Sequence, residues 1–209
     1  MKLIKVYCSV VFTLSCLYSG ARGARSCGRF PPLFGFQVDR YLGRWWQLEK
    51  TMNYREMMTG KCYSINYSRD PMSVNKLKMR TDYVTRVSNS PNTMFSTLAM
   101  VSPQFDPSHF RYAMSAMPWM KKNYRVIATD YENFSIEYMC NTNMLGNAEE
   151  SVWLLTRERH PSEAVRLQAK QILQVLGFEK LKLYDADQSC KEKPMRMQDQ
   201  SMLEWLFSV

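Results

Sequence analysis

Residues 41–50 read Tyr41-Leu42-Gly43-Arg44-Trp45-Trp46-Gln47-Leu48-Glu49-Lys50. A glycine stands two residues before a tryptophan, and the residues after it alternate in the manner of a β-strand. A Gly-x-Trp motif alone is a weak signal, because these residue types meet by chance in many proteins. The motif becomes informative only together with further elements along the chain.

Two such elements come later, in a matching order. Thr129-Asp130-Tyr131 is the first, and a predicted strand that ends in Arg157 and precedes a helical stretch is the second. With Gly43-Arg44-Trp45, at this spacing, they resemble the lipocalins, secreted β-barrels that hold a small apolar ligand inside. The resemblance is closest to the branch that contains apolipoprotein D and the insect bilin-binding proteins. It covers roughly Cys27 to Cys190.

Period-two alternation recurs between these elements. Its apolar members include Tyr63, Ile65 and Tyr67; Phe110, Tyr112 and Met114; and Tyr124, Val126 and Ala128. Turn signals separate such runs, at Arg69-Asp70-Pro71, Ser90-Pro91-Asn92 and Asp106-Pro107-Ser108. Short strands of this kind predict an antiparallel sandwich or barrel and leave that choice open. The resemblance implies an all-β, eight-stranded antiparallel up-and-down barrel (calyx) with one C-terminal α-helix packed outside.

The helix is predicted over Ser162–Leu176. There the apolar period changes to a helical one, with Val165, Ala169, Ile172 and Leu176 on one stripe. Ser162 suits the N-cap and Gly177 the C-terminal stop. Leu181 and Leu183 then alternate again, which predicts a short last strand.

The N-terminus predicts a signal peptide over residues 1–23. Lys2 and Lys5 precede an apolar run, Val6–Leu17, and Ala21-Arg22-Gly23 supplies small residues for cleavage. A membrane anchor is the alternative, but this run is shorter than the ~20 residues that span a bilayer. We therefore expect a secreted, extracellular protein with a lipocalin domain over residues 24–190.

Charge and the C-terminal tail bear on partners. Removing the signal peptide leaves 25 basic and 19 acidic residues, a net charge of +6, with no basic run longer than Lys121-Lys122. Such scattered charge argues against a nucleic-acid partner. Residues 191–209 are polar and then end in Met202-Leu203-Glu204-Trp205-Leu206-Phe207. We expect a mobile tail; contact with a membrane or a cell-surface receptor is the alternative.

Four cysteines remain after the predicted cleavage: Cys27, Cys62, Cys140 and Cys190. An even number without a CxxC pair favours two disulfides in an oxidising compartment and no metal site. Three pairings are open on the sequence alone. The resemblance implies Cys27 with Cys140 and Cys62 with Cys190.

The ligand-facing residues are predicted from strand register. Asn66-Tyr67-Ser68 is a glycosylation sequon, and a glycan on Asn66 must face solvent, which turns the flanking residues inward. Register on the lipocalin signatures extends the inward set, which is Tyr63, Ile65, Tyr67, Phe110, Tyr112, Met114, Tyr124, Val126 and Trp153. For each of these residues, ordinary barrel core is the alternative to a ligand contact. Glu137 has inward parity by the same register, and two interpretations are open: a place at the pocket wall or, the preferred one, an exposed or water-linked carboxylate. A second sequon, Asn133-Phe134-Ser135, is not predicted to carry a glycan.

The remaining signature residues have structural roles in the lipocalins. The resemblance implies that Trp45 seals the closed end of the barrel and that Arg157 packs over its indole. Gly43, Thr129, Asp130 and Tyr131 belong to the same end. No catalytic motif surrounds His109 or His160, and no free thiol remains, so the chain is not predicted to be an enzyme.

These observations predict a carrier of a small hydrophobic ligand such as a fatty acid, sterol, retinoid or tetrapyrrole, without a metal or an obligatory cofactor. The resemblance implies roles in lipid metabolism and oxidative-stress protection. A pigment carrier for biliverdin or a carotenoid is the main alternative. Ordinary flexible packing is the preferred explanation of Met114, Met117 and Met120, and an antioxidant that consumes hydroperoxides is the alternative. The sequence does not indicate an oligomeric state.

Overall fold

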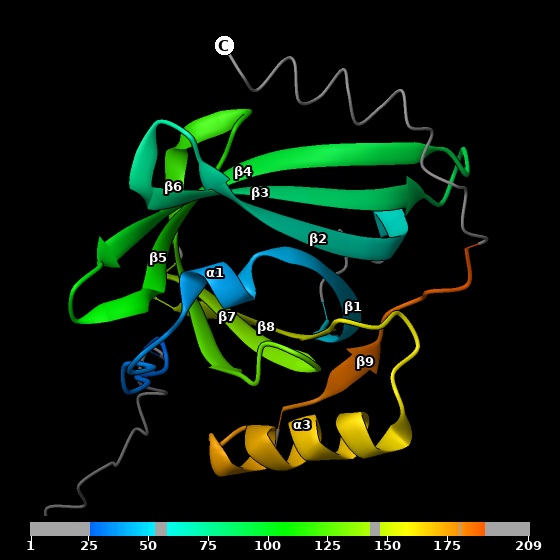
Figure 1. Ribbon diagram of the computed structural model, residues 1–209. Helices are drawn as coiled ribbons and strands as arrows, with labels where there is room; N and C mark the ends of the chain where they lie inside the picture. Colours follow the sequence, from blue (N-terminus) through cyan, green and yellow to red (C-terminus); the bar gives the residue numbers. More distant parts are fainter. Residues whose placement is uncertain (1–25, 53–57, 143–146, 180, 191–209) are drawn as a thin grey trace, which may run out of the picture.

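The computed structural model describes residues 26–52, 58–142, 147–179 and 181–190. The predicted signal peptide and the tail from residue 191 lie outside these ranges. Within them a strongly twisted antiparallel sheet closes on itself (Figure 1). Its strands are β1 (Gly43–Thr51), β2 (Gly60–Asp70), β3 (Ser73–Thr85), β4 (Pro91–Ser102), β5 (Asp106–Met114), β6 (Met117–Thr129), β7 (Phe134–Thr142) and β8 (Ala148–Thr156).

Strand β1 closes the barrel because it pairs with both β2 and β8. In this register Trp45 lies opposite Ile65 on β2, and Trp46 lies opposite Thr156 on β8. A ninth strand, β9 (Leu183–Asp185), adds to β1 outside the barrel. The predicted fold class, an eight-stranded up-and-down barrel with a short last strand, is confirmed.

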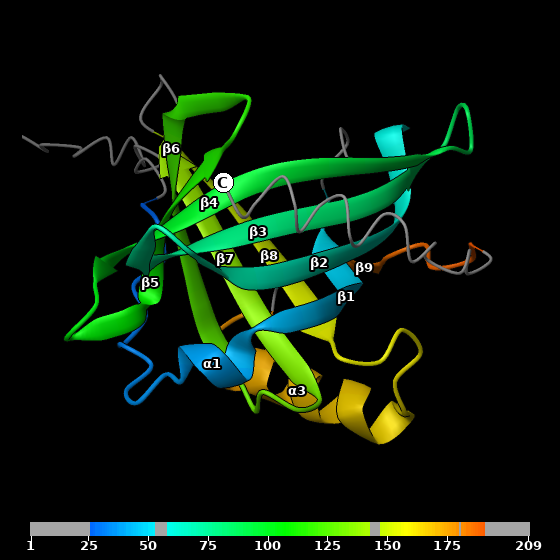
Figure 2. The same cartoon turned by 45° about the horizontal axis from the view of Figure 1, so that its top comes forward.

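The barrel has a closed end and an open end. The short helix α1 (Val38–Tyr41) lies beside the start of β1, at the end of the barrel where β7 begins and β8 stops (Figure 1, Figure 2). At the opposite end β1, β3, β5 and β7 stop and β2, β4, β6 and β8 begin. We call the end beside α1 the closed end and the opposite end the open end.

Helix α3 (Glu163–Val175) packs on the outside of the barrel (Figure 1). The Ser162 hydroxyl caps it by accepting a hydrogen bond from the Val165 N–H. Its apolar stripe meets outward-facing residues of β7 and β8, with Ala169 and Leu173 fully or almost fully buried. The predicted helix is therefore confirmed, and Leu173 joins the predicted stripe. No helix among the described residues is long and apolar enough to cross a bilayer.

Two disulfides join the terminal segments of the domain to the barrel. Cys27 is bonded to Cys140 and Cys62 to Cys190, with Cα–Cα distances of 5.8 and 6.2 Å. This is the pairing that the resemblance implies.

The turns predicted at Ser90-Pro91-Asn92 and Asp106-Pro107-Ser108 lie partly or wholly in strands, since β4 begins at Pro91 and β5 at Asp106. Asp106-Pro107-Ser108 opens β5, and the chain turns at residues 103–105 instead. Asp106 is buried, and its carboxylate pairs with Arg125 on β6 at 2.5 Å. That ion pair holds this segment in the sheet, although its composition is typical of a turn.

Candidate ligand cavity and the closed end beneath it

Trp45 forms the centre of the closed end. Its side chain is fully buried, and its Nε1–H donates to the Tyr41 carbonyl at 2.9 Å. The guanidinium carbon of Arg157 lies 3.7 Å from the centroid of the indole ring. A cation at this distance, partly removed from water, contributes about 1–2 kcal/mol.

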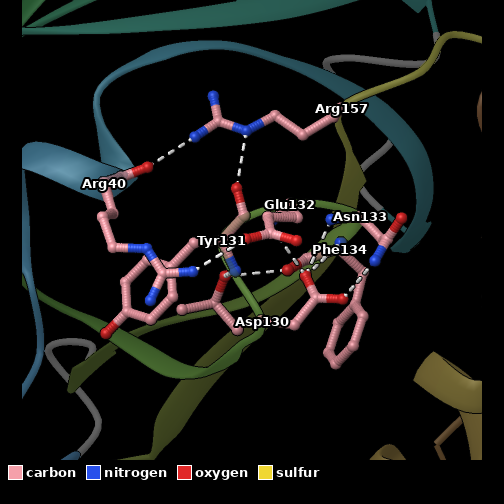
Figure 3. Close-up of polar contacts among 8 residues, drawn as sticks. Arg40, Asp130, Tyr131, Glu132, Asn133, Phe134 and Arg157 are labelled. Carbon is pink, nitrogen blue, oxygen red and sulfur yellow. Dashed lines mark hydrogen bonds and ion pairs between the residues drawn. The ribbon is translucent and has the colours of Figure 1, made fainter.

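Arg157 also fixes the backbone around that tryptophan. Its guanidinium donates to the carbonyls of Leu42, Arg44, Arg40 and Tyr131 at 2.8–3.0 Å, and Figure 3 shows the last two. Gly43 lies between two of these carbonyls with a φ of +91°, which favours glycine. A Cβ at Gly43 would make an ordinary contact with the Arg157 guanidinium at 3.4 Å, so the positive φ is what would strain a side chain there.

Thr129 ends β6, and Asp130 and Tyr131 begin the loop from β6 to β7 at the same end (Figure 3). The Asp130 carboxylate accepts hydrogen bonds from the backbone N–H groups of Glu132, Asn133 and Phe134. Partial burial opposes its ionisation, but these N–H donors outweigh it and lower the pKa of Asp130. Thr129 Oγ1 donates to the Phe134 carbonyl and accepts from the Tyr131 N–H. These residues therefore shape the closed end.

A buried carboxylate, Glu137, lies just above this end. It is only 1% exposed, and its Oε1 accepts hydrogen bonds from the hydroxyls of Tyr41 and Tyr67, both at 2.5 Å. The Tyr67 and Tyr124 hydroxyls lie 2.9 Å apart and complete the cluster. Burial raises the pKa of Glu137, and the three tyrosine hydroxyls partly oppose that shift.

Interpreting Glu137 as an exposed or water-linked carboxylate is wrong. Three phenols from α1, β2 and β6 converge on it and replace water as hydrogen-bond donors. Alternation indicates that Tyr67, Tyr124 and Glu137 all face inward, and this shared direction was the available signal for the cluster. Tyr41 carries no such signal, because it lies in a single turn of helix.

Above Glu137, the open half of the barrel encloses a cavity of about 430 Å³. All eight barrel strands contribute side chains to its wall. The lining residues are Gln47, Thr59, Tyr63, Ile65, Met79, Thr81, Tyr83, Met94, Tyr112, Met114, Lys122, Tyr124, Glu137, Met139, Ser151 and Trp153.

Six of the nine predicted ligand-facing residues line this cavity: Tyr63, Ile65, Tyr112, Met114, Tyr124 and Trp153. The other three, Tyr67, Phe110 and Val126, do not. Each is 1% exposed and packs in the core cluster of the closed end, with Trp45 and Leu155. Their side chains face inward at a level where the barrel is filled. Contact between the lining residues and a ligand stays a prediction.

The sequence interpretation missed several lining residues on β1, β3, β4 and β7. Met79, Met94 and Met139 add thioether surface, and Gln47 and Thr81 add polar groups. The latter two are buried, at 3% and 5% exposure, and neither Gln47 Oε1 nor Thr81 Oγ1 has a hydrogen-bond partner among the described residues. Thr81 alternates with Met79 and Tyr83, and this spacing was the available signal that its side chain faces inward. The signal was missed because a threonine interrupts the apolar pattern.

His109 lies outside the cavity lining, and the described residues contain no candidate metal centre. His109 lies on the outer face of the barrel, where it contacts Asn123 and Arg125. Burial lowers its pKa, and Arg125 acts in the same direction, although the contact with Asn123 opposes them. No group of three or more His, Cys, Asp or Glu side chains among the described residues could hold a metal ion.

Comparisons with known proteins agree with this geometry. The model of the lipocalin / cytosolic fatty-acid binding protein family matches residues 42–189. Apolipoprotein D from Macaca fascicularis is 29% identical over 188 residues, which cover 86% of this chain and 94% of that protein. Lazarillo protein from Schistocerca americana is 24% identical over 185 residues, which cover 87% of this chain and 82% of that protein.

A solved structure shows the same fold. Insecticyanin from the tobacco hornworm Manduca sexta superposes with a TM-score of 0.65 at 17% identity, covering 78% of this chain and 87% of that one. The family model spans well over half of the sequence, from the start of β1 to the end of the described chain. The protein therefore belongs to the lipocalin / cytosolic fatty-acid binding protein family.

Proposed function

We propose that this protein is a secreted carrier that reversibly buries one small hydrophobic ligand in the open half of its barrel. The observation that carries the proposal is the cavity of about 430 Å³ above a packed closed end. Ligand sites commonly enclose about 300–1,000 Å³. Family membership supports the same chemistry, because this family binds small hydrophobic molecules.

The lining favours a flat or elongated apolar molecule. The rings of Tyr63 and Tyr83 stack with centroids 5.0 Å apart, and those of Tyr112 and Tyr124 stack at 6.1 Å. Trp153 and the methionines complete an aromatic and thioether surface. Burying a ligand against it gains about 25 cal/mol for each Å² of apolar area removed from water. Fatty acids, retinoids and sterols are suitable probes.

A cavity-filling substitution tests this function. Ser151 lines the cavity, so Ser151→Phe should block it and weaken the binding of hexadecanoate and retinol at least tenfold in a titration. Ser73→Phe is the matched control, because Ser73 begins β3 at the closed end and should leave binding unchanged. Native mass spectrometry should find one ligand per chain, and visible absorbance would reveal a pigment. Unsaturable binding, or equal binding by all three proteins, would refute the carrier function.

Secretion and glycosylation at Asn66 form part of the proposal. Asn66 is partly exposed on β2, and its neighbours across the sheet are Arg44 and Arg80. Because side chains alternate along a strand, Asn66 faces away from the interior that Ile65 and Tyr67 face, and a glycan fits there. Protein from a secreting eukaryotic cell should lose mass on enzymatic deglycosylation, and Asn66→Gln should lack that shift.

The second sequon differs from Asn66 because its side chain is engaged. Asn133 lies in the loop from β6 to β7, and its amide donates to the Asp130 carboxylate at 2.7 Å. A glycan there would replace one of the two amide hydrogens and compete with this contact. We therefore propose Asn66 and not Asn133 as the glycosylated residue, and peptide mapping of the secreted protein tests both positions.

A role in oxidative-stress protection is a second candidate, favoured by four methionines in the lining: Met79, Met94, Met114 and Met139. A thioether attacks the O–O bond of a bound hydroperoxide, keeps one oxygen as sulfoxide and releases the alcohol. With a lipid hydroperoxide, these four should oxidise before Met72, which is 88% exposed, with one alcohol formed per sulfoxide. Preferential oxidation of Met72 would exclude a reaction in the cavity.

A further inference from the structure

We infer that the ligand presents hydrogen-bond donors, hydroxyl or N–H groups, to the inner wall of the cavity and keeps any anionic group at the open end. The inner wall is the part of the lining that contains Gln47, Thr81 and Glu137. This inference rests on the proposed carrier function and specifies the class of ligand. It depends on which polar atoms line the cavity and which of them already have partners.

Two buried oxygen atoms in the wall lack partners. Gln47 Oε1 on β1 and Thr81 Oγ1 on β3 are both buried, line the cavity and have no hydrogen-bond partner among the described residues. Leaving such an atom unpaired carries a penalty that a ligand can remove. Gln47 Oε1 only accepts, so a ligand hydroxyl or N–H relieves its penalty, and a ligand hydroxyl also satisfies the Thr81 hydroxyl, which both donates and accepts. An all-carbon ligand maintains both penalties.

The third polar group of the inner wall, the Glu137 carboxyl, is also an acceptor, and the nearest phenols are committed to it. The hydroxyl protons of Tyr41 and Tyr67 point to its Oε1, and Tyr124 bonds within the same cluster. These phenols are therefore not available as donors for a ligand carboxylate. A second carboxylate beside Glu137 would in addition carry the desolvation cost of a buried charge.

Positive charge lies toward the opposite end of the cavity. Among the described residues that line it, Lys122 is the one basic side chain. It precedes Tyr124 on β6, which begins at the open end, so it lies nearer the opening. Lys50, next to the last residue of β1, places its ammonium 5.0 Å from the ring of Tyr63. The cavity is thus cationic toward its opening and accepting within.

Hexadecanoate and ω-hydroxyhexadecanoate are the probes that distinguish a contact at the inner wall from a contact at the open end. Both carry a carboxylate for the open end, and they differ only in a terminal hydroxyl that would reach the inner wall. We expect the hydroxy acid to bind at least about tenfold more tightly, because a site with unpaired acceptors discriminates against an analogue that lacks the donor. Titration by calorimetry at neutral pH measures both affinities.

Two variants assign the preference to the inner wall. Thr81→Val keeps the side-chain shape and removes an unpaired hydroxyl, so the fold should keep its stability while the preference falls severalfold. Gln47→Met, of similar length, should reduce it as well. Thr97→Val is the matched control, since Thr97 lies on β4 outside the cavity lining and should keep the full preference.

The outcomes are distinguishable. A preference that falls in Thr81→Val or Gln47→Met and persists in Thr97→Val supports the inference. Equal affinities for the two acids, tighter binding of hexadecanoate, or a preference that survives both inner-wall variants would overturn it while leaving the carrier function intact. Failure of both acids, and of retinol, to bind the parent protein would overturn the carrier function and this inference together.

Discussion

The two halves of the barrel share one alternating pattern and use it differently. In the closed half the inward side chains, among them Trp45, Tyr67 and Phe110, are at most 1% exposed and fill the interior. In the open half the inward row continues through Tyr63, Thr81 and Trp153 but encloses a cavity. Inward orientation is therefore common to both halves, and packing against α1 and the closed-end loops decides which half becomes core.

The two halves are also stabilised by different kinds of interaction. At the closed end Arg157 joins four backbone carbonyls and the Trp45 ring without a covalent link. Toward the open end the two disulfides attach the terminal segments, at Cys62 near the start of β2 and at Cys140 near the end of β7. A half that surrounds a cavity has fewer packed contacts, and the covalent links compensate for the stability that the missing contacts would provide.

The largest expected effect compares two tryptophans. Trp45→Ala should lower the free energy of unfolding by about 3–5 kcal/mol, because it removes a fully buried ring from a filled interior. Trp153→Ala should cost less than about 2 kcal/mol, since that ring is partly exposed in a cavity wall. Urea denaturation of both variants measures the difference. Equal losses would mean that the two halves are packed alike.

Removing the disulfide between Cys62 and Cys190 should have the next largest effect. The double variant Cys62→Ala/Cys190→Ala opens a crosslink between residues 128 apart in sequence and should cost about 2–4 kcal/mol. Hydrogen exchange should then increase first at the start of β2 and near β9, while the N–H groups around Trp45 stay protected. Uniform loss of protection across the barrel would show that the halves do not differ in this way.

The buried carboxylate at the boundary gives a smaller, pH-dependent effect. Burial raises the pKa of Glu137 in the folded protein, so the protonated form is favoured and its stabilising contribution is lost as the pH rises through that value. The parent should therefore lose stability relative to Glu137→Gln as the pH increases above about 4.3. Burial raises the pKa of Tyr41, Tyr67 and Tyr124 well above their ordinary value, so these phenols do not titrate in this range.

Parallel denaturation series for the parent and Glu137→Gln from about pH 4 to about pH 8 check the sign. A stability difference that does not change with pH, or that shifts in favour of the parent, would contradict a raised pKa for this carboxyl.

Much of the fold could be predicted from the sequence because its signals are local. Alternation identifies strands, and Ser162 and Gly177 bracket a helical stripe that the structure reproduces. The closed-end residues could be assigned through the lipocalin resemblance. The Asp106 segment could not, because a buried ion pair with Arg125, distant in sequence, overrides its turn composition.

The cavity could be predicted only in part, because alternation gives the direction of a side chain but not its depth. Tyr67 and Phe110 have the same inward parity as Tyr63 and Tyr112, yet they lie in the filled half. Polar lining residues such as Thr81 look like outward positions in a hydropathy pattern. The environment of Glu137 depends on three tyrosines from separate elements, and only their arrangement in space reveals it.

The most direct test of the central claim, that the open half binds ligand and the closed half does not, is tryptophan fluorescence. Retinol or another apolar ligand should quench the emission of the parent saturably through Trp153, which lines the cavity, whereas Trp45 is fully buried below it. We predict that the quenching largely disappears in Trp153→Phe and persists in Trp45→Phe. Quenching in Trp153→Phe equal to that of the parent would contradict the claim.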